Sequence, residues 1–246
     1  MVEFYDKGNY VSKYADSHLD FSIRRCDALV SYINKKQKTV KTMLDLACGT
    51  GTFLNLMQEK LSINKCVGLD FSKKMLEYAM QNIKNDNVEF IYGDMTDFEF
   101  DEKFDLITCN YNAINELSPI SKWEKVFSLA YKHLNDNGMF SFDFNTIYKF
   151  SNGVRTFYAS NEEYDEVAKM TPNKDNSIEY LTITYEKTPD GQYIKEERKA
   201  TEYVYNLCEI KKLLKKVGFK NIKIGDKNFD KCNRKKQNRL FVICEK

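Results

Sequence analysis

Eight residues at the end of an apolar run carry the clearest chemical signal in the chain. Residues 44–51 read Leu-Asp-Leu-Ala-Cys-Gly-Thr-Gly, so a strand-like run ends in two glycines that open a helix-like segment. Gly49 and Gly51 lack a side chain, which lets the backbone approach a ligand closely. Asp70 ends the next strand-like run, where a carboxylate can accept hydrogen bonds from a ribose diol. These residues predict a loop that binds a nucleoside-containing cofactor, and they leave the choice of cofactor open.

The spacing of the glycines argues against a dinucleotide. A loop that binds a pyrophosphate needs a third glycine where helix and strand pack, in the pattern G-x-G-x-x-G. Leu54 occupies that third position after Gly49 and Gly51. NAD is therefore the weaker prediction for the cofactor.

The segments around this loop alternate between strand and helix, which is typical of a parallel sheet covered on both faces. The expected strands are residues 43–47, 66–69, 88–92, 104–109 and 138–144, and the expected helices are residues 49–61, 72–84 and 122–134. After residue 205 the pattern resumes with a helix that has a capping box at Asn206 and Glu209 and ends at Gly218. Residues 219–224 and 240–244 supply two last strands.

Two regions differ from this alternation. Residues 13–34 have apolar side chains at helical spacing, which predicts an amphipathic N-terminal helix. Residues 145–205 are rich in Tyr, Thr and charge around a Thr-Pro-Asp-Gly turn signal, which predicts an inserted antiparallel sheet. The predicted organisation is a core of residues 1–144 and 206–246, with a lid at 1–38, and an inserted β subdomain at 145–205.

Composition narrows the class of protein. With 246 residues, 42% hydrophobic, ten Gly and three Pro, the chain is globular and neither fibrous nor disordered. The net charge of +2 gives no global signature of nucleic-acid or membrane binding, and no apolar run is long enough to span a bilayer. Seven Cys without a Cys-x-x-Cys pair indicate reduced thiols, a cytoplasmic location and no structural metal site.

Four motifs together resemble the class I S-adenosylmethionine-dependent methyltransferases. They are residues 44–51, the run Val67-Gly68-Leu69-Asp70-Phe71-Ser72 with Met75 and Leu76, Gly93-Asp94-Met95, and Phe104-Asp105-Leu106-Ile107, in the order and spacing of that family. The resemblance implies a doubly wound, mostly parallel seven-stranded α/β sheet of Rossmann-like type. It also implies S-adenosyl-L-methionine as cofactor, with S-adenosyl-L-homocysteine as product.

The resemblance assigns cofactor contacts residue by residue. Asp45 and the backbone of Ala47, Cys48, Gly49 and Gly51 would hold the methionine part, and Asp70 the ribose hydroxyls. Phe71 and Met75 would line the ribose and adenine side, while Asp94 would accept from the adenine amino group and Met95 would pack on the ring. The backbone from Cys109 to Tyr111 would face the sulfonium. The family often has Gly where Ala47 stands, which implies a slightly tighter loop.

The architecture looks like the small-molecule branch of this family, where an N-terminal helix closes over the cofactor and a β insertion follows strand five. We therefore expect in-line methyl transfer to a nitrogen or oxygen of a small molecule, with the insertion covering the acceptor site. An RNA or protein methyltransferase and a non-catalytic S-adenosylmethionine-binding protein are the alternatives. Residues 109–112 read Cys-Asn-Tyr-Asn and lack the Asn-Pro-Pro-Tyr motif, and no Pro precedes a Cys, which makes planar-amine and cytosine acceptors less favoured.

Candidate acceptor-site residues follow the carboxyl ends of the strands or lie on the N-terminal helix. The catalytic candidates are Tyr14, His18, Asn112 and Asp143, and Tyr10, Asn115, Glu116 and Asn145 are further candidates. The ten aromatic residues of the insertion are interpreted as sheet packing rather than as an amine cage. The basic segment 231–239 is interpreted as a solvated hairpin rather than a phosphate-binding surface, and His133 as structural through the helix dipole.

Overall fold

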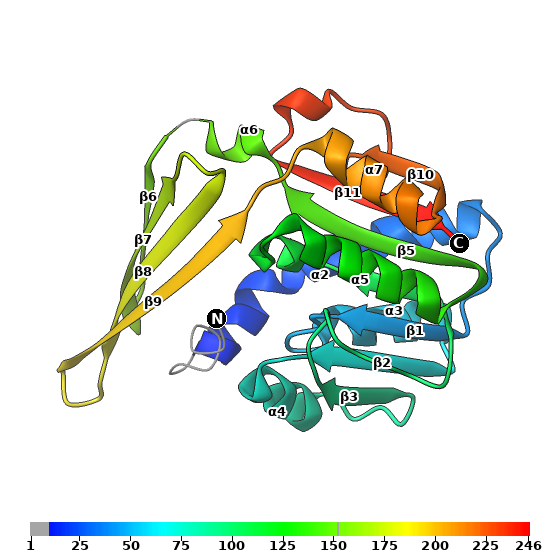
Figure 1. Cartoon of the computed structure of the whole chain (residues 1–246). Helices are drawn as coiled ribbons and strands as arrows, with labels where there is room; N and C mark the ends of the chain where they lie inside the picture. Colours follow the sequence, from blue (N-terminus) through cyan, green and yellow to red (C-terminus); the bar gives the residue numbers. More distant parts are fainter. Residues whose placement is uncertain (1–9, 152) are drawn as a thin grey trace.

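The computed structural model describes residues 10–151 and 153–246, in which two sheets form (Figure 1). The larger sheet has seven strands in the order β10-β11-β5-β4-β1-β2-β3. Its strands are β1 (Thr42–Leu46), β2 (Lys65–Asp70), β3 (Val88–Tyr92), β4 (Phe104–Cys109), β5 (Leu134–Asn145), β10 (Lys220–Gly225) and β11 (Arg239–Glu245). All neighbours pair in parallel except β11, which runs antiparallel to both β5 and β10. The predicted doubly wound, mostly parallel α/β sheet is confirmed.

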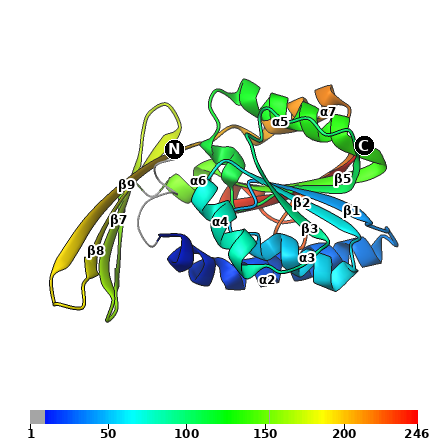
Figure 2. The same cartoon turned by 90° about the horizontal axis from the view of Figure 1, so that it is seen from below.

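Helices cover both faces of this sheet (Figure 2). On one face lie α2 (Tyr10–Lys35), α3 (Thr52–Leu61) and α4 (Lys73–Asn82), and on the other lie α5 (Ile120–His133) and α7 (Leu207–Val217). The α2 side buries Cys26, Leu29 and Ile33 against Met57 of α3. The opposite face buries Trp123 and residues of α7 against a row of Phe side chains of β5. The segments with apolar residues at helical spacing therefore form helices as predicted. The apolar face of each helix is removed from water by packing against the sheet.

The end signals read from the sequence form as expected, although several boundaries shift by one to four residues. Ser72 caps α4 by accepting from the Met75 amide, and Asn206 and Glu209 form the capping box of α7, which ends at Gly218 in the left-handed region (φ 119°). Strand β5 begins at Leu134, four residues before the expected start, because Leu134 already pairs with Phe104 of β4.

The insertion forms a four-stranded antiparallel sheet in the order β6-β7-β8-β9. A short helix, α6 (Ile147–Phe150), leads into β6 (Arg155–Ser160), β7 (Tyr164–Pro172), β8 (Ser177–Lys187) and β9 (Tyr193–Tyr203). The turn between β8 and β9 uses Gly191 at φ 80°, whose amide donates to the Thr188 carbonyl. This sheet projects beside the larger one (Figure 1), and Lys13 of α2 meets Glu186 of β8 at 2.5 Å.

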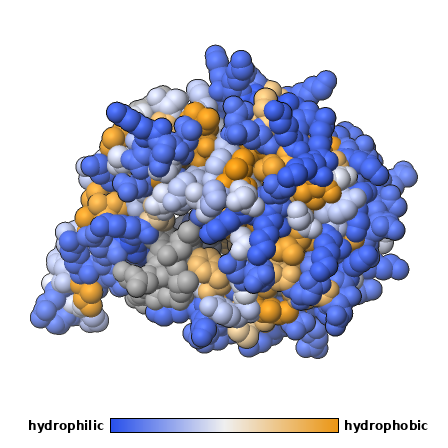
Figure 3. Space-filling model, in the orientation of Figure 1, coloured by the Kyte–Doolittle hydropathy of each residue, from blue (hydrophilic) through white to orange (hydrophobic). Residues whose placement is uncertain are grey.

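The parallel strands β1, β2 and β3 all point toward the side of the molecule where the inserted sheet and the start of α2 lie (Figure 1). The loops that follow these strands therefore meet beside α2 and the insertion. The face seen in Figure 3 is predominantly hydrophilic, with small hydrophobic patches. Among residues 10–151 and 153–246, no helix is both long and apolar enough to cross a membrane.

The structure refines two interpretations made from the sequence. His133 is buried in the last turn of α5, at the helix end that was expected. Its ring accepts from the Phe100 amide at 3.1 Å and bonds the Leu129 carbonyl at 2.9 Å, so local hydrogen bonds hold it in addition to its place at the helix end. In the basic segment 231–239, Arg234 donates to the Ile224 carbonyl at 2.9 Å, and Arg239 turns toward the strand ends. The segment is thus not wholly a solvated hairpin.

Candidate active site

The loop after β1 has a backbone that requires small residues. Ala47, Gly49 and Gly51 all have positive φ, and Gly51 is the N-cap of α3. A Cβ on Gly51 would lie 2.6 Å from the Phe90 ring, far inside van der Waals contact. Glycine at this position therefore serves both the left-handed conformation and the packing of loop against sheet.

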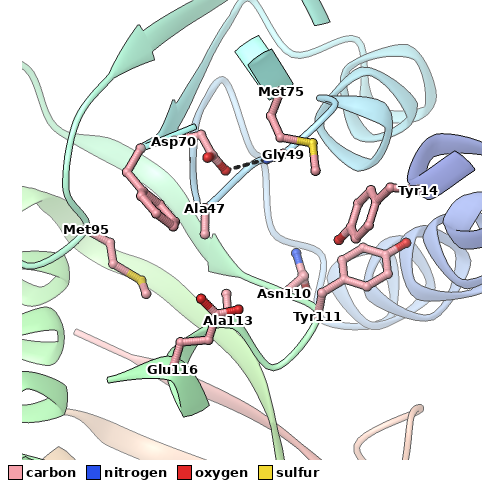
Figure 4. Close-up of a pocket in the computed structure, with 11 residues that line it drawn as sticks. Tyr14, Ala47, Gly49, Asp70, Met75, Met95, Asn110, Tyr111, Ala113 and Glu116 are labelled. Atoms are coloured by element: carbon pink, nitrogen blue, oxygen red, sulfur yellow. Dashed lines mark hydrogen bonds between the residues drawn. The ribbon is translucent and has the colours of Figure 1, made fainter. Parts of the chain in front are cut away.

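Asp70, at the end of β2, holds this loop in place. Its Oδ2 accepts from the Gly49 amide at 2.7 Å (Figure 4). Its Oδ1 accepts from the Ser72 amide at 2.9 Å. The carboxylate is nearly buried, so these bonds are made away from bulk water. Asp70 links β2 to the glycine loop while lining the cavity between them.

A cavity lies between this loop, the start of α4 and the first helix. Its lining, drawn in Figure 4, comprises Tyr14, Ala47, Gly49, Asp70, Phe71, Met75, Met95, Asn110, Tyr111, Ala113 and Glu116. An adjoining cavity shares several of these residues and adds Asp94, and a third adds Asp45 and Cys48. Most of the predicted cofactor-binding residues therefore line these three adjoining cavities. Gly51 and Cys109 do not line any of these cavities, since Gly51 packs under Phe90 and Cys109 is buried within the sheet.

The chemistry of this lining fits a sulfonium nucleoside. Phe71, Met75 and Met95 supply apolar surface for a flat ring, and Asp70 and Asp94 supply carboxylates to the adjoining linings. Carboxylates accept from ribose hydroxyls and from an exocyclic amine, while methionine sulfur and aromatic rings pack on a purine. The residues present therefore fit S-adenosylmethionine.

Beneath the loop, Asp45 belongs to a buried polar cluster. Its Oδ1 accepts from the Thr108 hydroxyl at 2.5 Å and from the Asn110 amide at 3.5 Å. Burial raises the pKa of Asp45 to about 7, and the nearby Asp70 acts in the same direction. Asp45 is consequently poised to carry either a proton or a charge near neutral pH.

Arg25, on α2, completes this cluster and was not anticipated from the sequence. Its Nε donates to Asn110 Oδ1 at 2.9 Å and its Nη2 donates to the Ser141 hydroxyl at 2.6 Å. Arg25 Cζ lies 5.0 Å from the ring centre of Phe229 and 5.2 Å from that of Phe241. Asn110 lines two of the cavities, and the sequence had placed it there only through its backbone, within the segment from Cys109 to Tyr111; its side chain was not a candidate.

Aromatic side chains of α2 close the cavity opposite Asp70. The Tyr14 ring stacks on His18 with ring centres 3.9 Å apart, and the Tyr111 hydroxyl donates to the His18 carbonyl at 2.6 Å. Burial raises the pKa of Tyr14, raises that of Tyr111 to about 12, and lowers that of His18. All three side chains are therefore uncharged near neutral pH.

A larger cavity of about 590 Å³ lies on the other side of these residues. It is bounded by α2, the loop after β4, the inserted sheet and Arg239. Its lining comprises Tyr10, Tyr14, His18, Phe21, Tyr111, Asn112, Glu116, Tyr180, Thr182, Ala200, Glu202 and Arg239. Of the predicted acceptor-site residues, Tyr10, Tyr14, His18, Asn112 and Glu116 are thus brought together. Of the ten aromatic residues singled out in the insertion, Tyr180 lines this cavity.

Asp143 lines none of the cavities described here and is fully buried. Its two oxygens accept from the amides of Tyr111 and Asn112, each at 2.9 Å, and Arg239 Nη1 lies 3.3 Å from Oδ2. All of these contacts shape the loop after β4. The geometry therefore favours a role for Asp143 in positioning that loop over direct contact with an acceptor.

Three asparagines tie this loop and the end of β5 to the insertion. Asn112 and Asn145 donate to the two oxygens of Glu202 on β9, at 2.9 and 2.7 Å. Asn115 accepts from the Asn145 amide at 2.8 Å and donates to the Tyr203 carbonyl at 2.9 Å. Glu202 was not a sequence candidate, because nothing in its surroundings along the chain distinguishes it from other charged residues of the insertion.

The fold and site together define an α/β protein with a cavity suited to a nucleoside beside the glycine loop and a larger cavity that adjoins it. The sequence model of a known family, described as a methyltransferase domain, matches residues 37–204 of this chain. The chain therefore belongs to this family. It is a class I S-adenosylmethionine-dependent methyltransferase, as its motifs predicted.

A solved structure and two curated proteins illustrate what this chain is similar to. An S-adenosylmethionine-dependent methyltransferase from Clostridium acetobutylicum superposes with a TM-score of 0.81 at 22% identity, covering 95% of this chain and 98% of that one. A malonyl-[acyl-carrier protein] O-methyltransferase of Acetivibrio thermocellus is 23% identical over 85% of this chain and 75% of its own. A dTDP-3-amino-3,6-dideoxy-alpha-D-glucopyranose N,N-dimethyltransferase of Streptomyces fradiae is 26% identical over 47% of this chain and 44% of its own.

Proposed function

We propose that this enzyme methylates a small molecule that binds in the 590 Å³ cavity, while the cofactor occupies the cavity beside the glycine loop. The observation that carries this proposal is that the two cavities share Tyr14, Tyr111 and Glu116. A methyl donor and an acceptor bound on either side would meet there. The relative named for an amino-sugar substrate supports a small-molecule acceptor over RNA or protein.

The residues of the chain would act mainly by alignment and exclusion of water. When bound, S-adenosylmethionine supplies a methyl group activated by a sulfonium. Asp70 would accept from ribose hydroxyls, Asp94 from the adenine amine, and Asp45 would face the methionine part. Tyr14 would cover the reacting centre, which lowers the local dielectric and fixes the acceptor close to the line of attack.

The organisation of the chain into a core and an insertion fits separate sites for the cofactor and the acceptor. We infer that residues 145–205 form a subdomain that covers the acceptor, inserted in a core of residues 1–144 and 206–246. The four-stranded sheet and its four lining residues support this division. Residues 10–38 would act as the lid, and residues 1–9 of the expected lid lie outside the described part of the chain. Seven free thiols, most of them buried, support a reduced, cytoplasmic location.

Calorimetric titration with S-adenosylmethionine, S-adenosylhomocysteine and NAD tests the cofactor assignment first. Tight binding of both sulfur nucleosides without NAD is expected. An acceptor-library screen that detects release of S-adenosylhomocysteine then separates an enzyme from a non-catalytic binding protein. Salt-sensitive association with RNA would instead favour a macromolecular acceptor.

The role of Tyr14 is tested with two substitutions. Tyr14→Ala removes the ring that stacks on His18 and is expected to weaken cofactor binding and turnover together. Tyr14→Phe keeps the ring and separates stacking from any contribution of the hydroxyl. If both variants kept wild-type affinity and turnover, Tyr14 would have no part in the site.

A further inference from the structure

Glu116 stands at the junction of the two cavities. It lies in the turn η1 (Ala113–Glu116) after β4 and lines both cavities together with Tyr14 and Tyr111. Figure 4 shows its side chain at the edge of the cofactor cavity across from Met75. A methyl group can pass between donor and acceptor only where both are within reach, so groups at this junction surround the reacting atoms.

Among the described residues common to both linings, Glu116 alone has a carboxyl group. The other two are phenols, and burial raises the pKa of each, so neither accepts a proton near neutral pH. His18, which stacks on Tyr14, holds its Nδ1 at 2.9 Å from the Tyr14 carbonyl. Of the three residues that line both cavities, Glu116 is therefore the one whose side chain can receive a proton from the acceptor.

The charge of the acceptor cavity agrees with a cationic occupant. Its lining holds two carboxylates, Glu116 and Glu202, and one guanidinium, Arg239. Asp143, outside the lining, lies 3.3 Å from Arg239 and offsets its charge. The Glu202 oxygens accept from the side-chain amides of Asn112 and Asn145, and Tyr180 is also hydrogen-bonded to this carboxyl group, so its hydrogen-bond partners are neutral. Within the lining itself, carboxylates therefore outnumber cations by two to one, and Lys149 acts on Glu202 from outside the lining.

Aromatic rings add a second feature that favours a cation. Tyr10, Tyr14 and Phe21 of α2, Tyr111 of the loop and Tyr180 of the insertion all line the cavity. Ring faces attract an ammonium group, most strongly where water is excluded. Most of these rings come from the lid helix and not from the insertion, so the cage emerges only when α2 packs over the strand ends.

We propose, on the basis of the function proposed above, that the acceptor is a small-molecule amine and that Glu116 binds its ammonium form and removes the proton. The neutral nitrogen then forms a bond to the methyl carbon as the carbon–sulfur bond breaks, and the electron pair of that bond stays on sulfur. The product is the methylated ammonium, and the proton taken by Glu116 leaves to solvent. One proton is released for each methyl group transferred.

Binding to the protein loaded with S-adenosylhomocysteine tests the recognition step without turnover. The probes are matched pairs of amine and alcohol: benzylamine with benzyl alcohol, cyclohexylamine with cyclohexanol, and glucosamine with glucose. We expect at least one amine to bind ten-fold or more tightly than its alcohol, and Glu116→Gln to abolish that preference. Glu77→Gln, the same change at an exposed position of α4, is the matched control and should leave the preference intact.

Turnover with the preferred amine tests the proton transfer. Glu116→Gln is expected to lower kcat/KM by about a hundred-fold, in line with the loss of one general base, and Glu116→Asp to restore part of it. Alcohols that bind and react as well as amines, no binding of any amine, or an unchanged amine preference in Glu116→Gln would each overturn the proposal. Failure of the wild type to bind S-adenosylhomocysteine would instead overturn the proposed function itself.

Discussion

Arg25 Nε donates to Asn110 Oδ1 at 2.9 Å, which ties α2 to the residue that follows β4. The same guanidinium donates to Ser141 on β5, so one buried cation joins α2 to the end of β4 and to β5. Burial lowers the pKa of Arg25 to about 10, which leaves it charged near neutral pH. The position of α2 and the orientation of Asn110 in the cofactor cavity are therefore coupled.

Replacing Arg25 should destabilise the fold and disturb the cofactor site. Arg25→Met leaves Asn110 and Ser141 without their buried donor, and we expect a loss of about 2 to 5 kcal/mol in the free energy of unfolding. Urea unfolding measures this loss. Arg24→Met is the control, because the Arg24 side chain is exposed and pairs with Asp20 on the surface. Equal effects of the two substitutions would mean that the buried network contributes little.

Asp70→Asn should weaken cofactor binding. In the wild type, the two Asp70 oxygens accept from the backbone amides of Gly49 and Ser72. The variant places a side-chain NH2 donor against one of these N–H donors, and it also removes a charged acceptor from the ribose position. Affinity for S-adenosylhomocysteine, measured by calorimetry, should fall by about 1.5 to 3 kcal/mol. Asp97→Asn, at an exposed side chain, is the control. Unchanged affinity would place the ribose elsewhere.

Asp45 should make stability depend on pH between its unfolded and folded pKa values. Its folded pKa of about 7 lies above the reference of 3.8, so between these values the folded state holds a proton that the unfolded chain releases. Its contribution is fully present below the reference pKa and is lost as pH rises through about 7. Wild type should therefore lose stability relative to Asp45→Asn over this range.

Urea unfolding of both proteins at about pH 5 and about pH 8 measures this contribution. Asp45→Asn retains an acceptor for the Thr108 hydroxyl but cannot ionise. The expected change in the difference between the two proteins is on the order of a few kcal/mol. A difference that stays constant with pH would show that Asp45 keeps the same protonation state in the folded and unfolded protein.

Gly51→Ala should cost more than loss of conformational freedom alone. Both Gly51 (φ 72°) and Gly191 (φ 80°) have positive φ, but a Cβ at Gly51 meets the Phe90 ring at 2.6 Å and one at Gly191 meets nothing within 4 Å. Gly191→Ala should therefore cost about 1 kcal/mol from backbone strain. Gly51→Ala should add about 1 to 3 kcal/mol for overpacking, measured by thermal unfolding. Equal costs would mean that Phe90 moves aside freely.

Local patterns in the sequence were sufficient for the elements and for the cofactor loop. Apolar spacing, the Ser72 cap and the Asn206–Glu209 capping box depend on residues a few positions apart, and each formed as predicted. The glycine loop and Asp70 could also be placed, because consecutive parallel strands bring their carboxyl ends to one edge. The motif spacing then determined the family.

Tertiary structure alone decided which distant side chains complete the site. Arg25 meets Asn110 across 85 positions of sequence, Asn112 meets Glu202 across 90, and Arg239 reaches Asn112 across 127. The position after β4 marks Asn110 and Asn112 in the sequence, but no local pattern marks Arg25, Glu202 or Arg239 as their partners. Their partners are fixed by the packing of α2, the insertion and β11 over the strand ends, where a buried charge or amide must find a hydrogen bond that water no longer provides.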